Sequence, residues 1–318
     1  MKSKAEKKVQ VRNAFLASVV SIVISAGAAL VAGFVLKLGV LCSILVFAIV
    51  FALTLAALIY VWKTTDLIRK ILYLLYCIKH PAKSRRFYCS CCNRTLEGFI
   101  ELGYSKDSER FDSKRFMKQK QDVICPFCYS APRQRIQAVW LEANMSTVKD
   151  SRILCFAPEY SMMKWFRRNG IKVTTADLFD SKAELKLDIT NIDLPDESYD
   201  VVICNHVLEH VSSYENALTE LNRILVDKGL LIVSFPLDEG LDTVFEQEAS
   251  TPEYRIRLFG QVDHVRIFGR DSAEILTSFG FDVQAINISE MPENILPVVG
   301  PADYDSNQIY ICRKVLNE

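Results

Sequence analysis

The sequence lacks an excess of charge of either sign, because 38 basic and 38 acidic residues balance over 318 positions. A protein that coats nucleic acid carries a strong basic excess, so this class is excluded for the chain as a whole. The chain also lacks the composition of a disordered or collagen-like protein, since half of its residues are apolar and only 12 are glycine. The length predicts about two domains.

Charge is absent altogether from two stretches near the N-terminus. Residues 14–36 and 38–62 contain no charged side chain, and only Lys37 separates them. Each stretch exceeds the ~20 residues that a helix needs to cross a bilayer. Because backbone polar groups find no water within lipid, we expect a hairpin of two transmembrane helices in residues 1–62. A cleaved signal peptide ending near residues 26–28 is the alternative, although the apolar stretch continues past it.

Lysine and arginine flank the expected hairpin on both sides. Positively charged flanks stay cytoplasmic, so we expect an integral membrane protein with both termini and the C-terminal part in the cytoplasm, at the inner or plasma membrane if the source is bacterial. Residues 63–84 have apolar side chains at helical spacing beside basic ones. They predict either a helix lying in the membrane interface or a continuation of the second membrane helix.

Ten cysteines are present, and the five outside residues 85–132 are scattered, which suits a reducing compartment rather than a disulfide framework. Two C-x-x-C pairs have the spacing of a four-thiolate zinc site. The predicted ligands are Cys89, Cys92, Cys125 and Cys128. We therefore expect a structural zinc ribbon in residues 85–132. Cys91 is an alternative ligand in the first pair, and a redox pair or unmetallated thiols are alternative interpretations.

A local run of basic residues extends from Arg110 to Arg135, with two phenylalanines among them. Nucleic-acid contact is one interpretation of such a run. A solvated hairpin edge, or attraction to anionic lipid beside the membrane, is the interpretation that we favour. We do not expect nucleic acid as a partner, because the chain as a whole is neutral.

From residue 133 to 318, short apolar runs alternate with helical patterns. This succession predicts a parallel sheet with helices on both faces. The expected strands are residues 152–158, 171–179, 198–206, 229–236, 281–288 and 308–314. The expected helices are residues 133–145, 161–170, 213–226 and 271–279, the last with Gly280 at its C-cap.

The sequence of residues 133–318 resembles the class I S-adenosylmethionine-dependent methyltransferases. The resemblance rests on LKLDITNIDLPDESYDVVICNHVLEHV (185–211), which is followed by ALTELNRILVDKGLLIVSFP (217–236). It also rests on a subgroup that has a cysteine ribbon, a first loop similar to APE (157–159), and a late segment similar to QVDHVRIFGRD (261–271). It implies an α/β fold: a doubly wound, seven-stranded Rossmann-like sheet whose last strand is antiparallel and lies beside the fifth. It also implies S-adenosylmethionine as cofactor.

The resemblance places cofactor-binding residues at the ends of the central strands, where open sheets bind ligands. These residues are Ala157, Glu159, Asp177, Asp188, Ile189, Asn205 and His206. Asp177 is expected to accept hydrogen bonds from the ribose hydroxyls, and Asp188, with the Ile189 backbone, to meet the adenine. Asn205 and His206 are expected beside the methionine part. A turn, cap or packing role is the alternative for each of the polar residues.

The first loop departs from the family pattern of an acidic residue followed by glycines. Cys155 takes the acidic position, while Ala157 and Glu159 take the two glycine positions, and Pro158 removes one backbone donor. We expect Glu159 to meet the cofactor's ammonium group in place of the missing carboxylate. A catalytically silent domain that serves as a scaffold is the alternative.

Residues 237–270 are long, charged and aromatic, and they occupy the place where family members often carry a substrate lid. Asp263 and His264 form the predicted catalytic base pair, since a histidine titrates near working pH. Arg266 is expected to hold a substrate anion, and Tyr254 to contact the substrate. The alternative is a surface loop whose charges pair with one another.

H-x-x-E-H at residues 206–210 is also an inverted zinc-peptidase signature. In that interpretation, two histidines on one face of a helix would bind zinc. The motif here directly follows a predicted strand, and the flanks on both sides match the methyltransferase pattern, so we expect Glu209 and His210 to fix the start of a helix instead.

These observations together predict a membrane-anchored, cytosol-facing methyltransferase. Its expected acceptor is an O, N, S or C nucleophile on a small or lipid-linked molecule. A silent methyltransferase-like scaffold at the membrane is the second hypothesis, and a tethered nucleic-acid modifier is the least favoured.

Overall fold

A computed structural model describes residues 71–82, 84, 86–100, 124–238, 240–248, 251–259, 261–287 and 308–316. The expected hairpin of residues 1–62 lies outside them. The chain forms two units, residues 1–82 with 103–105, and residues 83–102 with 106–318. In the first unit, the described part is helical over residues 71–79. Within the described ranges, no helix combines the length and the hydrophobicity that crossing a membrane requires.

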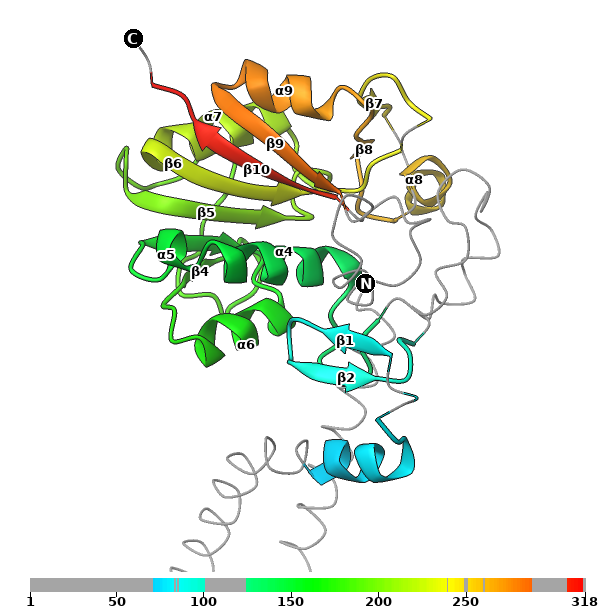
Figure 1. The fold of residues 1–318 in the computed structure, drawn as a ribbon. Helices are drawn as coiled ribbons and strands as arrows, with labels where there is room; N and C mark the ends of the chain where they lie inside the picture. Colours follow the sequence, from blue (N-terminus) through cyan, green and yellow to red (C-terminus); the bar gives the residue numbers. More distant parts are fainter. Residues whose placement is uncertain are drawn as a thin grey trace, which may run out of the picture. The chain divides into compact units, whose positions relative to one another are not determined.

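The second unit is built on a mixed sheet with the strand order β4-β3-β5-β6-β10-β9 (Figure 1). Its strands are β3 (Ile153–Phe156), β4 (Thr174–Ala176), β5 (Tyr199–Asn205), β6 (Leu225–Ser234), β9 (Phe281–Asn287) and β10 (Gln308–Lys314). The four strands from β3 to β6 are parallel, whereas β10 runs antiparallel to both β6 and β9. An antiparallel last strand beside β6 was expected, and its bounds are those predicted.

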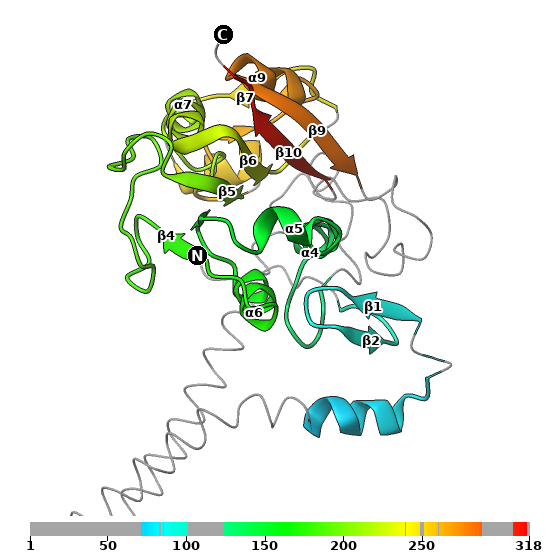
Figure 2. The ribbon, with the colours of Figure 1, turned by 60° about the vertical axis from the view of Figure 1, so that its left-hand side comes forward.

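Helices cover both faces of this sheet (Figure 2). They are α4 (Pro132–Ala143), α5 (Met145–Val148), α6 (Tyr160–Arg168), α7 (Tyr214–Ile224) and α9 (Ser272–Ser278). Successive strand residues point to opposite faces. Ile153 accordingly packs in the cluster that contains α4 and α6, and Leu154 in the cluster that contains α7 and α9. The sheet is therefore doubly wound, as predicted.

Two sequence predictions need correction. The described part of the sheet has six strands, not seven. Leu185 forms only an isolated parallel bridge to Ala176, and Asp188 folds into a turn in which its carbonyl accepts from the Asn191 amide at 3.1 Å. The turn takes the chain away from the sheet before a strand is established. In addition, α7 ends at Ile224, because Leu225 already has extended backbone and begins β6.

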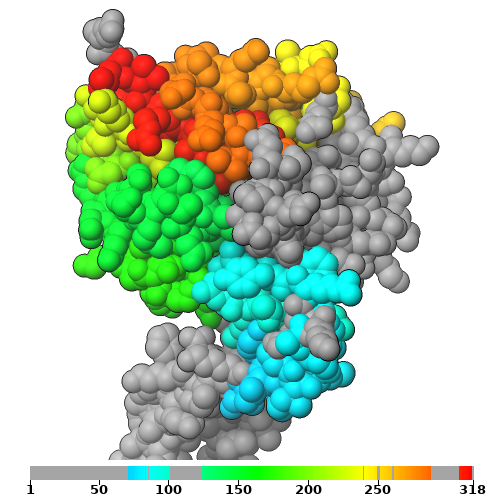
Figure 3. Space-filling model, in the orientation of Figure 1, coloured from blue at the N-terminus to red at the C-terminus, as the bar shows by residue number. Residues whose placement is uncertain are grey.

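The cysteine ribbon packs against the sheet domain. Its two strands, β1 (Phe87–Cys89) and β2 (Arg94–Leu96), form an antiparallel hairpin. Leu96 lies in one buried cluster with Ile136 of α4 and Trp165 of α6, and Figure 3 shows the cyan region of the ribbon in contact with the green region of the sheet domain. The ribbon and the sheet domain therefore share a hydrophobic core.

The segment between β6 and α9, expected to be a lid, has its own secondary structure. It contains β7 (Phe245–Glu246), α8 (Pro252–Phe259) and β8 (Arg266–Ile267), with β7 antiparallel to β8. Phe259 and Ile267 form a small buried cluster of their own. The segment is therefore held by local packing.

Candidate functional site

Two loops meet at one edge of the sheet. Because β3 and β5 are adjacent and parallel, the loop after Phe156 and the turn after Asn205 leave the sheet side by side. Ala157 has φ +46° and donates its N–H to the Ala176 carbonyl at 2.9 Å. This left-handed conformation favours glycine, so Ala157 adopts the backbone geometry that the family pattern assigns to a glycine.

Glu159 precedes α6 and lies in this loop. Its Oε1 accepts from the Arg133 guanidinium at 2.5 Å. Its Oε2 is buried and has no hydrogen-bond partner among the described residues. Since buried polar atoms are normally paired, an unpartnered carboxylate oxygen fits a ligand that donates hydrogen bonds, such as an ammonium group. Cys155, at the family's acidic position, is buried, and this burial raises the pKa of its thiol.

The two aspartates predicted to bind the cofactor each use one oxygen in a local turn. Asp177 follows β4, and its Oδ1 accepts from the amides of Phe179 and Asp180 at 2.7 and 2.8 Å. Asp188 Oδ1 accepts from the amide and the hydroxyl of Thr190 at 2.9 and 2.7 Å. Ile189 is buried. Asp177 and Asp188 thus both stabilise local turns, and the contact of these residues with the cofactor stays a prediction.

Asn205, predicted to lie beside the methionine part of the cofactor, is held within the fold by its side chain, and its cofactor contact stays a prediction. Its side chain is buried, accepts from the Ser234 hydroxyl at 2.9 Å and donates to Gln137 Oε1 at 2.7 Å. These bonds join β5, β6 and α4 and engage both ends of the amide. Gln137 was missed by the sequence analysis, and the available signal was a polar residue on the inward face of a predicted amphipathic helix.

Three of the four histidines in the chain gather around Glu209. His206 has φ +53°, and its Nδ1 lies 3.1 Å from Glu209 Oε1. His210 Nε2 lies 3.8 Å from the same oxygen. His264 comes from the segment before β8, and its ring centroid is 4.7 Å from that of His210. The chain therefore brings residues from two distant segments to one carboxylate.

The protonation states in this cluster follow from burial and from the neighbouring charges. Burial lowers the pKa of His264 to about 4 and also lowers that of His206. Burial by itself raises the pKa of Glu209, but its interactions with His206 and His264 outweigh this effect and lower it to about 2. Burial thus favours the neutral forms of His206 and His264, whereas the neighbouring imidazoles favour the ionised form of Glu209.

The expected Asp263–His264 base pair is not the arrangement found. Asp263 Oδ2 lies 3.6 Å from His210 Nδ1, so Asp263 faces His210. His264 is only 3 % exposed, and its Nδ1 bonds to the Phe259 carbonyl at 3.0 Å. Asp263 ends a turn and His264 follows it, and the two side chains contact different partners.

Arg266 is a second correction. It is buried and pairs with Glu246, and its Nη1 donates to the carbonyls of Leu208 and Val211 at 2.5 and 2.6 Å. The guanidinium N–H groups of Arg266 thus donate hydrogen bonds to the turn after β5, and they are not directed at a substrate anion. Tyr254, in α8, accepts a hydrogen bond from Gln247 at 2.9 Å, and its role toward a substrate stays a prediction.

The H-x-x-E-H motif lies on a turn, since α7 begins only at Tyr214. A peptidase of the inverted type would carry both histidines on one face of a helix. The peptidase interpretation therefore lacks its structural context. Glu209 and His210, expected to fix the start of a helix, lie in the turn that precedes α7.

The four predicted zinc ligands lie together. The sulfur atoms of Cys89, Cys92, Cys125 and Cys128 are within 4.8 Å of one another. Cys89 is 3.6 Å from Cys128, and Cys92 is 3.8 Å from Cys125. Zinc–sulfur bonds of about 2.3 Å in a tetrahedron require sulfurs about 3.8 Å apart, so the set fits zinc. Cys91 points elsewhere, with its thiol donating to the Gln134 carbonyl at 3.3 Å.

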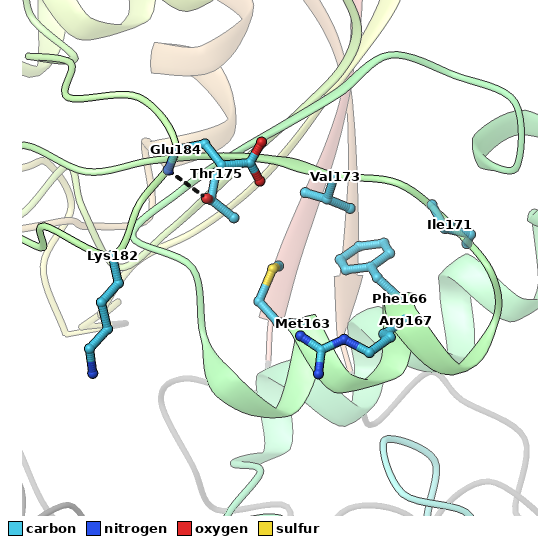
Figure 4. A pocket seen from close by; sticks show the side chains of 8 residues that line it. All are labelled: Met163, Phe166, Arg167, Ile171, Val173, Thr175, Lys182 and Glu184. Atoms are coloured by element: carbon cyan, nitrogen blue, oxygen red, sulfur yellow. Dashed lines mark hydrogen bonds between the residues drawn. The ribbon is translucent and has the colours of Figure 1, made fainter. Parts of the chain in front are cut away.

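A pocket of about 350 Å³ lies beside the edge strand β4 (Figure 4). The lining residues are Met163, Phe166, Arg167, Ile171, Val173, Thr175, Lys182 and Glu184. They come from α6, β4 and neighbouring turns, and none comes from the loops after β3 and β5. The pocket is thus lined by other residues than those predicted to bind the cofactor.

Comparison with known proteins identifies the class of this domain. Residues 154–286 match a family model described as a methyltransferase domain. The predicted resemblance to class I S-adenosylmethionine-dependent methyltransferases is confirmed, and residues 154–286 form a methyltransferase domain. The prediction of an enzyme of this class is confirmed with it. The match spans less than half of the chain and leaves the N-terminal part unassigned.

Solved structures resemble the domain only distantly. A Burkholderia thailandensis 1,6-didemethyltoxoflavin-N1-methyltransferase has 16 % identity, with 58 % of this chain and 79 % of that chain covered and a TM-score of 0.37. A methyltransferase from Archaeoglobus fulgidus has 15 % identity, with 57 % and 94 % covered and a TM-score of 0.38. One from Mesorhizobium loti has 16 % identity, with 56 % and 98 % covered and a TM-score of 0.38. No curated protein matches the chain.

Proposed function

We propose that the protein is a membrane-anchored methyltransferase whose catalytic domain faces the cytosol and acts on a small-molecule or lipid-linked acceptor. The observation that carries the catalytic part is the loop of residues 157–159. This loop combines a left-handed alanine at a glycine position with a buried, unpartnered oxygen of Glu159, at the sheet edge where open α/β folds bind ligands.

The residues at this edge fit the methyl donor. Glu159 would bind its ammonium group, Asp177 its ribose through the oxygen that the local turn leaves over, and Asp188 with Ile189 its adenine. His206, at the end of β5, would border the methionine part. When bound, S-adenosylmethionine supplies an electrophilic methyl group, and the protein's part is to orient the acceptor and exclude water.

The membrane anchor is supported by the sequence of residues 1–62 and by the short helix that follows. In the helix of residues 71–79, several large apolar side chains are between 47 % and 72 % exposed. They are Ile71, Leu72, Leu74, Leu75 and Ile78. An apolar helical face beside basic residues suits the headgroup boundary of a bilayer. An anchored catalytic domain favours a lipid or a lipid-linked precursor as acceptor.

The ribbon contributes structure to this proposal. Cys89, Cys92, Cys125 and Cys128 would hold a zinc ion that leaves no open coordination position. Ser130 Oγ lies 3.2 Å from both Cys89 and Cys128, and such hydrogen bonds from the surroundings orient thiolate ligands. The metal would thus fix a module that packs on α4 and α6.

A silent scaffold is the competing function, and the engagement of the Asn205 side chain by Gln137 and Ser234 is the observation that favours it. Calorimetry of the full chain with S-adenosylmethionine and with its demethylated product separates the two. If the chain binds neither ligand, the catalytic proposal is contradicted. Membranes that contain the full chain are then incubated with a labelled methyl donor. Label in the lipid fraction supports a lipid acceptor, whereas label in the aqueous fraction alone contradicts it.

A further inference from the structure

The side chain of Glu209 is a buried carboxylate that lacks a cationic partner such as lysine or arginine among the described residues. The residue has no exposed surface, its Oε2 has no hydrogen-bond partner within the described residues, and its Oε1 is paired with imidazole nitrogens. His206 Nδ1, at 3.1 Å from Oε1, is its nearest polar neighbour. Burying an ionised carboxylate is costly unless it is paired or coordinates a metal. A cation at this position would therefore complete the cluster.

The two histidines beyond Glu209 are oriented in the way that metal ligands require. His264 uses Nδ1 on the Phe259 carbonyl, which leaves its Nε2 buried and without a partner. His210 places Nδ1 3.2 Å from the Asp263 carbonyl, which leaves Nε2 toward Glu209. Histidines that bind metals almost always hold their second ring nitrogen on a carbonyl or carboxylate in this manner.

The ligand atoms are close together and are held there by the backbone. One oxygen of Glu209 and one nitrogen each of His210 and His264 lie within 4.8 Å of one another. Small side-chain rotations bring such atoms onto one ion at roughly 2.0–2.2 Å from each. Val265 donates its N–H to the Glu209 carbonyl at 2.9 Å, so His264 is placed beside the turn without any metal.

We propose that Glu209, His210 and His264 bind a divalent metal ion, with the remaining coordination positions open to water or to a donor atom of the acceptor. Two imidazoles and one carboxylate suit first-row divalent ions, and three protein ligands with open positions are typical of catalytic metal sites. His210, whose side chain is 31 % exposed, provides the side that opens to solvent. The binding of metal stands without the proposed function, whereas the contact with an acceptor rests on it.

The test is a titration of the purified full chain with Mn²⁺. Binding is measured as the loss of the free Mn²⁺ signal in electron paramagnetic resonance. Mn²⁺ suits this oxygen and nitrogen set, whereas thiolates select zinc, so the ribbon does not compete for the probe. No methyl donor is present. A failure to bind Mn²⁺ is thus separate from a failure to bind S-adenosylmethionine.

We expect wild type to bind Mn²⁺ saturably. Loss of outer hydrogen bonds alone costs roughly 10–100-fold in metal affinity, so removing a ligand in Glu209→Gln or His210→Ala should weaken binding at least that much. His210→Ala changes a partly exposed residue, and circular dichroism identifies any variant that fails to fold. His80→Ala, which alters the one histidine outside the cluster, should bind as wild type does. No binding by wild type, or equal binding by a folded Glu209→Gln or His210→Ala, overturns the proposal.

Discussion

Val265 donates its backbone N–H to the carbonyl oxygen of Glu209 at 2.9 Å, joining the segment before β8 to the turn after β5. The two residues are far apart in the sequence, and the bond is made by main chain, so it does not depend on either side chain. Arg266 reinforces the junction by donating to the carbonyls of Leu208 and Val211. The segment expected to be a substrate lid is thus anchored, at its C-terminal end, to the candidate site.

The first prediction concerns this anchor. Arg266→Met removes a buried guanidinium and leaves the carbonyls of Leu208 and Val211 without their donor, which should cost about 3 kcal/mol. For a domain of this size, we expect the midpoint of thermal unfolding to fall by roughly 6–12 °C. Arg270→Met is the matched control, because Arg270 and Asp242 form an exposed pair that contributes at most about 1 kcal/mol. Equal midpoints for the two variants would refute the structural role of Arg266.

The second prediction tests the ribbon. Cys125→Ser removes one of four clustered thiols and should abolish stoichiometric zinc in the purified chain, measured by atomic emission. Cys91→Ser serves as the control, since Cys91 donates to the Gln134 carbonyl outside the cluster and serine keeps a donor there. We expect it to retain zinc. Zinc retained in Cys125→Ser, or lost in Cys91→Ser, would show that the ligand set is wrong.

The third prediction concerns the methyl donor. Glu159→Gln removes the negative charge of a buried carboxylate whose Oε2 has no partner in the described structure. A hydrogen bond to a charged group is worth about 1.5–3 kcal/mol, so calorimetry should show an affinity for S-adenosylmethionine reduced by roughly 10–100-fold. Glu184→Gln, a change at the pocket beside β4, should leave the affinity unaltered. Unaltered affinity in Glu159→Gln would place the ammonium group elsewhere.

The sequence predicted the architecture well where apolar periodicity determines it. β10 matches the predicted bounds because its successive residues, such as Ile309 and Tyr310, pack on opposite faces of the sheet. The missing seventh strand shows the limit of the same signal. LKLD (185–188) alternates as a strand does, yet the turn at Asp188 ends it after one bridge, and turn geometry is not encoded in hydropathy.

The site was less predictable, because its contacts join distant segments. The adjacency of Asp263 and His264 in the sequence predicts a pair, but their side chains face different partners. The proximity of His264 to Glu209 and His210 depends on the backbone hydrogen bond from Val265 to Glu209. No local sequence pattern predicts that bond. Arg266 looked like an anion ligand because sequence does not reveal that carbonyl groups surround its guanidinium.

The last prediction returns to the first loop. Ala157 holds φ +46°, a conformation that costs an L-residue with a Cβ roughly 1 kcal/mol and costs glycine nothing. Ala157→Gly should therefore leave stability unchanged or raise it, although glycine also makes the unfolded chain more flexible. In the ordinary buried helix position of Ala138 in α4, the same change to glycine should lower stability by about 1 kcal/mol or more.

Thermal unfolding of both variants measures the difference, which we expect to be a few degrees in favour of Ala157→Gly. Since the loop lies where the methyl donor is proposed to bind, the affinity for S-adenosylmethionine should not fall in Ala157→Gly, because the backbone keeps its shape. If Ala157→Gly unfolds as early as Ala138→Gly, the left-handed conformation is not the one adopted, and the loop does not have the backbone geometry on which the proposed cofactor site depends.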